Sequence, residues 1–581
     1  MALTRLRLWV AQTNVVALMV PMELLYKPAA ISRGKTNGRL VVVSKRVPLP
    51  SSSVAPAAGG LAVALQAALK PRGGLWFGWS GKTSEESKPA AQCRTVGSLT
   101  YAVCDLSRRD IEQYYCGFAN RVLWPICHYR LDLAKLSECN AAAYFRVNEQ
   151  FARELHKLLR RDDIIWVHDY HLIPIARFLR QMGCANRIGF FLHIPWPGRE
   201  VASALPAYQR ILRCFGAYDV VGFQTEADAD NFRDCIVAAN AGRPASGDWC
   251  EIDGRRMQVS AFPIGIDNEA IAQEARAAEK NSTVKRMLAS LEGRDLVIGV
   301  DRLDYSKGLK QRMAAFATFL ERSPQSARAR VTMLQITPKS RSEVPEYAHM
   351  QRDLEEEAGR INGKLGDVDW TPLRYINKAM SHSVLAGLYR MSRIGLVTPL
   401  RDGMNLVAKE YVASQAPDNP GVLVLSQFAG AAQELKSALI VNPYDIEATA
   451  AAIARAFAMP LDERKDRWHA MMAALRANSV HDWASHFLQA LANEAESGEF
   501  DSALDGARFP GAAGLERLSA IGAAPRRVPI FVFDQPRAES RIERAQFRKV
   551  RPVSLVSSIA RVPAPGNSFA RVLQHHLTVV P

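Results

Sequence analysis

The stretch RDGMNLVAKEY (residues 401–411) places an acid, a glycine and an amide where an apolar run meets a helix-like segment. The run IGLVTPL ends just before it, so the order is strand, tight turn and helix. Glycine lets backbone approach a ligand closely, and the free N–H groups at a helix start attract anions. Half of a nucleotide-binding unit and an ordinary strand-to-helix turn both fit this stretch, so the rest of the chain must decide.

Short apolar runs of the same kind recur along the chain. Their Val, Ile, Leu and Phe residues are nearly continuous, which indicates strands buried on both faces, as in parallel sheets covered by helices. Amphipathic segments such as 149–160, 309–322 and 447–457 separate the runs, so the repeated β-α pattern predicts an α/β fold. Ligands of such sheets bind beyond the carboxyl ends of the strands. The runs lie at 39–46, 163–171, 187–197, 219–225, 295–308, 331–341, 394–403 and 421–430.

The runs form two sets. FPIGID (262–267) ends the first set, and a charged, helical stretch follows before the second set begins. We therefore expect two Rossmann-like, doubly wound domains that face each other across a cleft. Their predicted bounds are 39–267 and 268–475, and a C-terminal helix at 476–500 is expected to pack back on the first domain.

The two ends of the chain differ from its body. Residues 1–38 and 501–581 are expected to be largely disordered, as an N-terminal extension and a basic tail rich in Pro, Ala, Gly and Arg. Of the net charge of +16, residues 1–38 carry +4 and residues 505–581 carry +7, which leaves +5 between them. A nucleic-acid groove in the body is therefore not expected.

Cysteine usage and the N-terminus predict a cytoplasmic protein. All nine cysteines lie between Cys93 and Cys250 without a C-x-x-C pair, a pattern typical of free thiols in a reducing compartment. Arg5 and Arg7 precede LWVAQTNVVALMV, but polar residues interrupt this run, which favours an extension over a targeting signal. No apolar run reaches membrane-spanning length, so no membrane partner is expected.

DRLDYSKG (301–308) supplies two cations just past a predicted buried strand. Arg302 and Lys307 would face the helix start at 403–407 and form a metal-free site for a diphosphate, Arg as a planar fork and Lys as a point charge. Solvated surface charges are the alternative, and the presence of RDGMN in the same predicted domain favours the binding site. No cofactor is expected.

Glu410 follows Leu406 by four residues and so lies on the same helix face. Its carboxylate could accept two hydrogen bonds from a ribose diol, or it could be a surface acid paired with Lys409.

Other motifs carry less weight. HDYH (168–171) with His193 lies at a strand end, not on the helix that paired zinc histidines prefer, and Asp367-x-Asp369 is interpreted as a turn. GGLWFGWSG (73–81) is interpreted as flexible glycine turns flanked by aromatic residues. No Walker loop or G-x-G-x-x-G follows a strand, which disfavours a kinase or dehydrogenase.

Ten motifs, in this order, resemble the trehalose-6-phosphate synthase family over residues 39–495. The resemblance implies a GT-B architecture and metal-free transfer of glucose from UDP-glucose to glucose 6-phosphate, with retention, giving an α,α-1,1-linked product. It also implies substrates as the main partners and a homo-oligomer, a dimer or tetramer. The motifs are VVVSKR, GGLAVAL, GGLWFGWSG, LWPICHYR, IIWVHDYHL, RIGFFLHIPWP, RLDYSKG, AGRINGK, LVTPLRDGMNLVAKEYVA and GVLVLSQFAGAA.

The resemblance also assigns roles to single residues. Arg302 and Lys307 would neutralise the leaving diphosphate, Asp402 would bind donor hydroxyls, Glu410 the ribose, and His193 would lie by the transferred glucose. The donor phosphates would meet backbone at Gly403, Met404, Asn405 and Leu406, under a mobile loop that contains Gly60. The acceptor phosphate would meet Arg46, Tyr115 and Arg341, and the acceptor sugar Trp124 and Asp169.

Three positions depart from the family pattern. Lys45 replaces the usual Asn beside Arg46, Asp301 replaces Glu beside Arg302, and WPGRE (196–200) replaces FPxxE. Two other functions remain open at this stage: a glucosylglycerol-phosphate synthase that uses glycerol 3-phosphate, and a silent regulatory subunit of a trehalose-synthesising complex. The second is disfavoured because the phosphate-binding cations are all present.

Overall fold

The computed structural model describes residues 38–49, 65, 66, 69, 73–85, 90–328, 330–339 and 345–493. The predictions made for the N-terminal extension, for the basic tail, and for Gly60 and Arg341 lie outside these ranges. No described helix is both long and apolar enough to cross a membrane.

The first sheet has ten strands in the order β3-β4-β2-β1-β5-β6-β7-β10-β9-β8. Its six central pairings, from β4 to β10, are parallel, and β3, β9 and β8 add antiparallel edges. The strands are β1 Leu40–Arg46, β2 Gly74–Ser84, β3 Gln92–Val96, β4 Leu99–Ser107, β5 Ile164–His168, β6 Arg187–Phe191, β7 Val220–Phe223, β8 Gly242–Pro244, β9 Trp249–Ile252 and β10 Arg255–Ala261.

The second sheet has six strands, all parallel, in the order β13-β12-β11-β14-β15-β16. Its central strands are buried on both faces, as their continuous apolar sequences require. The strands are β11 Asp295–Val300, β12 Val331–Ile336, β13 Leu373–Ile376, β14 Ile394–Val397, β15 Val422–Ser426 and β16 Leu439–Val441.

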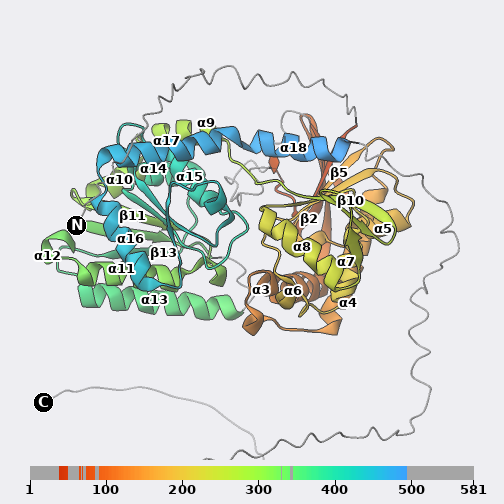
Figure 1. Ribbon diagram of the computed structural model, residues 1–581, viewed down its shortest axis with the longest axis horizontal. Helices are drawn as coiled ribbons and strands as arrows, with labels where there is room; N and C mark the ends of the chain where they lie inside the picture. The colour runs from red at the N-terminus through yellow and green to blue at the C-terminus, as the bar shows by residue number, and fades with distance from the viewer. Residues whose placement is uncertain are drawn as a thin grey trace, which may run out of the picture. The chain divides into compact units, whose positions relative to one another are not determined.

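Helices pack against both sheets (Figure 1). The larger ones are α4 Glu138–His156, α5 Ile175–Gln181, α7 Tyr208–Phe215, α8 Glu226–Ala238, α9 Asn268–Ala278, α10 Ser282–Leu291, α11 Leu309–Arg322, α13 Pro345–Leu365, α14 His382–Met391, α15 Leu406–Ser414, α16 Ile446–Ala458, α17 Leu461–Ala477 and α18 Val480–Ala492. A π-helix, η2, spans Ile111–Leu123, and shorter helices are α2 Arg108–Asp110, α3 Trp124–Cys127, α6 Arg199–Ala202, α12 Gln325–Arg328, η3 Leu131–Leu133, η4 Tyr170–Leu172, η5 Tyr305–Lys307 and η6 Gly430–Gln433.

Among the described residues, three hydrophobic cores lie between these layers. Successive residues of β1 alternate between cores: Val41 and Val43 face one, and Val42 faces another. The core that contains Val42 is continuous across both sheets, because it also includes Ile298 of β11 and Trp483 of α18. The α/β class is as the sequence predicts, and both sheets are parallel at their centre, although the first adds antiparallel edge strands.

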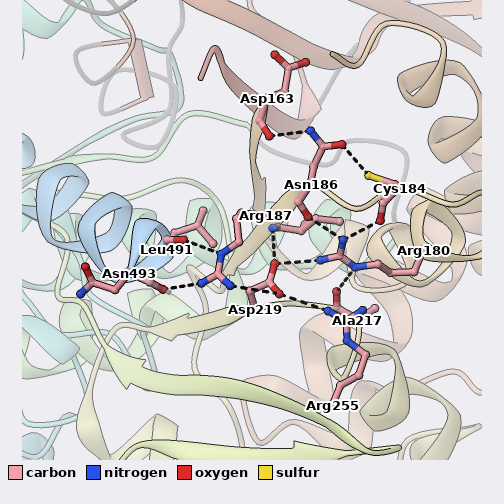
Figure 2. Close-up of polar contacts among 11 residues, drawn as sticks. Asp163, Arg180, Cys184, Asn186, Arg187, Ala217, Asp219, Arg255, Leu491 and Asn493 are labelled. Carbon is pink, nitrogen blue, oxygen red and sulfur yellow. Dashed lines mark hydrogen bonds and ion pairs between the residues drawn. The ribbon is translucent and has the colours of Figure 1, made fainter. Parts of the chain in front are cut away.

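The last described helix returns to the first sheet. α18 contacts β6 and β7, and Arg187 at the start of β6 holds its end by donating to the carbonyls of Leu491 (3.0 Å) and Asn493 (2.8 Å). Figure 2 shows that the same arginine reaches Asp219, which Arg180 and Arg255 also contact (2.9 and 3.3 Å). A mostly buried carboxylate shared by three arginines thus anchors the helix end.

The interpretation of GGLWFGWSG as flexible turns is wrong beyond its first glycines. Gly73 and Gly74 have positive φ and form the turn, but β2 begins at Gly74 and continues through the aromatic residues. Gly78 lies where a Cβ would come within 2.0 Å of the Ser44 carbonyl, so glycine here serves the close approach of β1. Alternating aromatic residues favour a strand, and that signal outweighs the glycines.

Candidate functional site

Each sheet reverses its winding at one point. In the first sheet the chain runs outward from β1 to β2 and β4, and then returns to place β5 on the other side of β1. In the second it runs from β11 to β12 and β13, and returns to place β14 beside β11. Ligands of open α/β sheets bind beyond the carboxyl ends of strands at such points. The candidate site is therefore formed by the segments that follow β1, β5, β11 and β14.

The loop after β14, residues 398–405, is held by its own side chains. Asn405 has φ 77°, and its side-chain oxygen accepts from the backbone N–H of Ala408, which caps α15. Its amide nitrogen donates to Asp402 Oδ2 at 3.0 Å. The backbone N–H groups of the first turn of α15 before Ala408 receive no bond from this cap, so they can meet an anion.

Lys307 carries positive charge to this loop. It ends η5, just after β11, and its ammonium pairs with Asp402 Oδ2 while both side chains are mostly buried. Arg302, on the same connection, is exposed, and no bond joins it to another described residue. The structure thus brings Lys307 and Asp402 together and leaves the Arg302 guanidinium available to a ligand.

Arg312 supports both connections, and the sequence reading missed it. This arginine is fully buried and pairs with Asp301 at 2.6 Å, and it donates to Thr398 (3.1 Å) and to the Lys307 carbonyl (3.4 Å). Asp301 therefore faces the interior, where burial raises the pKa of its carboxyl and Arg312 opposes that shift. The sequence does contain a signal for it, because Arg312 lies on the apolar stripe of the helix at 309–322, where a charged residue needs a buried partner.

The two sheets meet at Gly403. A Cβ on this residue would lie 2.3 Å from the carbonyl oxygen of His193, which follows β6, so only glycine fits between the segments. Gly430 closes the other side, because its own Cβ would lie 1.9 Å from the Gly403 carbonyl. Trp124, at the start of α3, makes a second link through its Nε1, which donates to Asp304 after β11 (3.4 Å).

Glu410 lies one turn into α15 and is mostly buried. Its carboxylate is 3.7 Å from Nε2 of His382, whose Nδ1 is 2.8 Å from Glu274. These contacts, hydrogen bonding to Glu410 foremost, raise the pKa of His382 to about 9. The alternative pairing with Lys409 is wrong, since Lys409 is buried and pairs with Glu434 at 2.6 Å.

At the end of β1, cations and aromatic rings lie together. Arg46 is exposed, 6.0 Å from the Trp79 ring, and the Lys45 ammonium lies 3.4 Å from the Tyr115 ring centroid and 4.6 Å from that of Trp79. Tyr115 in turn stacks on His171 at 5.9 Å. The position at which this chain carries Lys45 therefore belongs to the same cluster as Arg46 and Tyr115.

Asp169 has a strained backbone at the end of β5. Its φ of 78° and ψ of 160° lie in a region that only glycine enters easily, at a cost of roughly 1–3 kcal/mol. Its Oδ1 accepts from the His193 backbone N–H (3.4 Å), and its Oδ2 lies 3.8 Å from His171. Strain of this kind is typical of functional sites.

The remaining motifs have structural roles. Asp367 and Trp370 exchange backbone hydrogen bonds (3.0 and 3.2 Å) in a tight turn, as the sequence predicts. Trp196 of WPGRE is buried and packs edge-on against Phe215 and Phe232. In the described ranges, no group of three His, Cys, Asp or Glu side chains is placed to hold a metal ion.

Comparison with known proteins adds sequence and structural relatives. The model of glycosyltransferase family 20 matches residues 38–493. A trehalose-6-phosphate synthase of Sinorhizobium fredii is 57% identical over 455 residues, which cover 78% of this chain and 98% of the relative.

Two solved structures of similar proteins contain ligands. An alpha,alpha-trehalose-phosphate synthase (UDP-forming) from Burkholderia xenovorans, in complex with glucose-6-phosphate, superposes with a TM-score of 0.76 at 48% identity and covers 78% of this chain and 100% of its own. A trehalose-6-phosphate structure from Escherichia coli, bound with UDP-2-fluoro glucose, gives a TM-score of 0.74 at 47% identity, with 78% and 99% covered.

Proposed function

The chain belongs to glycosyltransferase family 20, and from this premise we propose that it transfers the glucosyl group of UDP-glucose to glucose 6-phosphate. Configuration at the transferred carbon is retained, and the products are α,α-trehalose 6-phosphate and UDP. The two parallel sheets are the two halves of a GT-B enzyme. The observation that carries the proposal is the contact of Gly403 with His193, because it brings the carboxyl-end edges of both sheets together in one site.

The second sheet holds the donor. Arg302 and Lys307 neutralise the diphosphate, whose oxygens also meet the backbone from Gly403 to Leu406, Met404 and Asn405 included. Asp402 binds hydroxyls of the donor glucose, and Glu410 accepts from the ribose diol. Two cations next to a helix start stabilise a leaving diphosphate by electrostatics alone, so we expect turnover without a bound metal.

The first sheet holds the acceptor. Arg46 and Tyr115 meet its phosphate, Asp169 its sugar hydroxyls, and Trp124 lies at the border with the second sheet. Arg341 is proposed as a further phosphate ligand and Gly60 as part of the closing loop, although both lie outside the described residues. Lys45 adds a cation beside Arg46, which strengthens the field for a dianionic acceptor.

The chemical step exchanges one bond to the anomeric carbon for another. The bond from this carbon to the β-phosphate oxygen breaks, the acceptor's 1-oxygen bonds to the same face, and its proton passes to the departing phosphate oxygen. The negative charge of Asp402 is already balanced by the Lys307 ammonium, and its Oδ2 accepts a hydrogen bond from Asn405. Asp402 therefore serves as a hydroxyl ligand and not as a nucleophile. His193, at the Gly403 contact, lies beside the transferred glucose.

Acceptor choice is the test of this proposal. UDP release by the purified chain with UDP-glucose is measured with glucose 6-phosphate and, separately, with glycerol 3-phosphate. We expect kcat/KM to be at least tenfold higher with glucose 6-phosphate. A preference for glycerol 3-phosphate would make the chain a glucosylglycerol-phosphate synthase, and inactivity with both would favour a regulatory subunit.

Assembly and location stay predictions. The family resemblance favours a homo-oligomer, a dimer or tetramer, which sedimentation velocity would measure. A cytoplasmic location agrees with the nine cysteines, all of which are free thiols.

A further inference from the structure

Two imidazoles lie in contact behind the Gly403 junction. Nδ1 of His168, the last residue of β5, is 3.1 Å from Nε2 of His193. His168 is fully buried, whereas His193 keeps part of its surface exposed. Burial lowers the pKa of His193 to about 3 and that of His168 well below its usual value, so both rings are neutral at pH 7. One of the two facing nitrogens therefore carries a proton and donates a hydrogen bond to the other.

The surroundings of His168 decide which nitrogen donates. Its Nε2 is buried and has no partner among the described residues, and the same holds for Nε1 of Trp166 and Nε1 of Trp483. The His168 ring centroid lies 4.5 Å from that of Trp166 and 6.3 Å from that of Trp483. An indole nitrogen can only donate. This aromatic cluster therefore contains two donors that lack an acceptor.

A proton on His168 Nε2 would add a third unpaired donor to the cluster. A buried donor without a partner is unfavourable, whereas a bare Nε2 supplies an acceptor to a cluster whose other unpaired described polar atoms, the two indole nitrogens, can only donate. This difference favours the tautomer in which Nδ1 of His168 carries the proton and donates to Nε2 of His193. His193, being neutral, must then carry its own proton on Nδ1.

We propose that His168 is a positioning residue that fixes His193 in the Nδ1-protonated tautomer, so that His193 offers an N–H donor to an oxygen of the glucosyl donor. His168 does not reach substrate and acts only through His193. Trp166 of β5 and Trp483 of α18 hold His168 in this state. The inference rests on the proposed function, because it needs a glucosyl group beside Gly403.

The tautomer can be measured directly on the full chain without ligand. Ring 15N and 13Cδ2 chemical shifts distinguish the two neutral tautomers, and His193→Gln assigns the signal. We expect His193 to be protonated on Nδ1 in the wild-type protein. A proton on Nε2 of His193 would overturn the proposal. Because this spectrum needs no variant of His168, a variant that fails to fold does not affect it.

Variants of His168 test the consequence for catalysis. His168→Phe keeps a buried ring but removes the bond, and His168→Asn restores an N–H that can donate to His193. We expect kcat/KM for UDP-glucose to fall about tenfold in the Phe variant and to recover in the Asn variant, with KM for glucose 6-phosphate unchanged. An Asn variant as impaired as the Phe variant would contradict the role of the bond.

A matched control separates this bond from packing. Phe191 packs on both imidazoles, with ring centroids 6.4 Å from His168 and 4.7 Å from His193, and forms no hydrogen bond with either. Phe191→Leu should keep the wild-type tautomer signature, and loss of that signature would show that packing sets it. An inactive wild-type chain would refute the proposed function, while its spectrum would still decide the inference about His168.

Discussion

At the scale of single residues, the site depends on charges placed before a ligand arrives. Lys307 and Asp402 come from connections that follow neighbouring strands of one sheet, and their ion pair fixes both side chains. Arg312 fixes the backbone beneath them, because it joins the end of β14 to the connection after β11. Such preorganisation costs nothing when the leaving group develops its charge.

Lys307→Ala removes the cation that faces the leaving diphosphate. We expect kcat to fall by about 100-fold, because one preorganised charge group contributes roughly 3 kcal/mol to transition-state stabilisation. UDP release under saturating substrates measures it. Lys310→Ala is the control: Lys310 is exposed, pairs with exposed Asp353 and should leave kcat unchanged. A similar fall in kcat in both variants would show that the effect comes from the loss of any nearby positive charge and not from the position of Lys307.

Residue position predicts part of this site and not the rest. The sequence predicts Arg302, Lys307, Asp402 and Glu410 as site residues because each follows a recognisable apolar run, and the structure brings Lys307 and Asp402 together. Their partners cannot be found in this way. The contacts of Arg312 with Thr398 and of His168 with His193 depend on how separate strands pair, which local sequence does not encode.

At the scale of elements, α18 is the link between the candidate site and the last described residues. Its Trp483 lies 4.9 Å from Trp166 and 6.1 Å from His193, measured between ring centroids. Arg187 holds the end of α18 by donating to the carbonyls of Leu491 and Asn493 (Figure 2). This clamp therefore helps to keep Trp483 in the aromatic cluster.

Arg187→Ala should release the end of α18. We expect the free energy of unfolding to fall by about 1–3 kcal/mol, since two hydrogen bonds from a charged donor are lost. Hydrogen exchange at the amides of 485–493 should quicken more than that of β6. Arg243→Ala is the control, because Arg243 is exposed and pairs with Glu251 near a sheet edge. Unchanged exchange in α18 would refute the clamp.

His382→Gln tests the contacts of α14 with Glu410. The folded pKa of about 9 is above the unfolded value of 6.5, so the charged His382 stabilises the fold fully below pH 6.5. This contribution declines as pH rises from 6.5 to about 9. The difference in Tm between wild type and variant should shrink across that window, as measured by thermal unfolding. A difference that stays constant with pH would exclude His382 as its source.

Most elements that frame the site follow from the sequence, and the exceptions have physical causes. All eight apolar runs contain a strand, because continuous burial on both faces leaves a clear pattern. β2 was missed because its glycines indicate turns locally, although they serve close strand packing. The π-helix at Ile111–Leu123 has no sequence signal of its own, yet it places Tyr115 near Lys45.

At the scale of the whole molecule, the chain passes between the two sheets at residues 264–268 and again at 475–480, and hydrogen bonds link these two crossings. Val480 donates to the Ile266 carbonyl (3.2 Å), and the Asn268 amide donates to the Leu475 carbonyl (2.7 Å). Lys409 lies in the first turn of α15, the helix that follows the 398–405 loop. It donates to the Ile264 carbonyl (2.7 Å) and pairs with Glu434. The buried ammonium of Lys409 thus links α15 to the first crossing at residues 264–268.

Lys409→Met should destabilise the protein strongly. Removing one partner of a buried ion pair leaves Glu434 without its cation, which costs about 3–5 kcal/mol. Urea unfolding measures the change, and the double variant Lys409→Met/Glu434→Gln should recover part of it. If the losses in unfolding free energy of the two single variants simply added in the double variant, the two residues would not be coupled.

The most direct test of the complete site is the product formed when the purified chain receives UDP-glucose and glucose 6-phosphate in the presence of EDTA. One-dimensional and 13C-coupled NMR would identify the new glycosidic linkage. We predict a 1,1-linked disaccharide phosphate with both anomeric carbons in the α configuration. A product with a β linkage at the transferred glucose, or transfer that requires a restored divalent cation, would contradict a site in which Arg302 and Lys307 neutralise the leaving diphosphate.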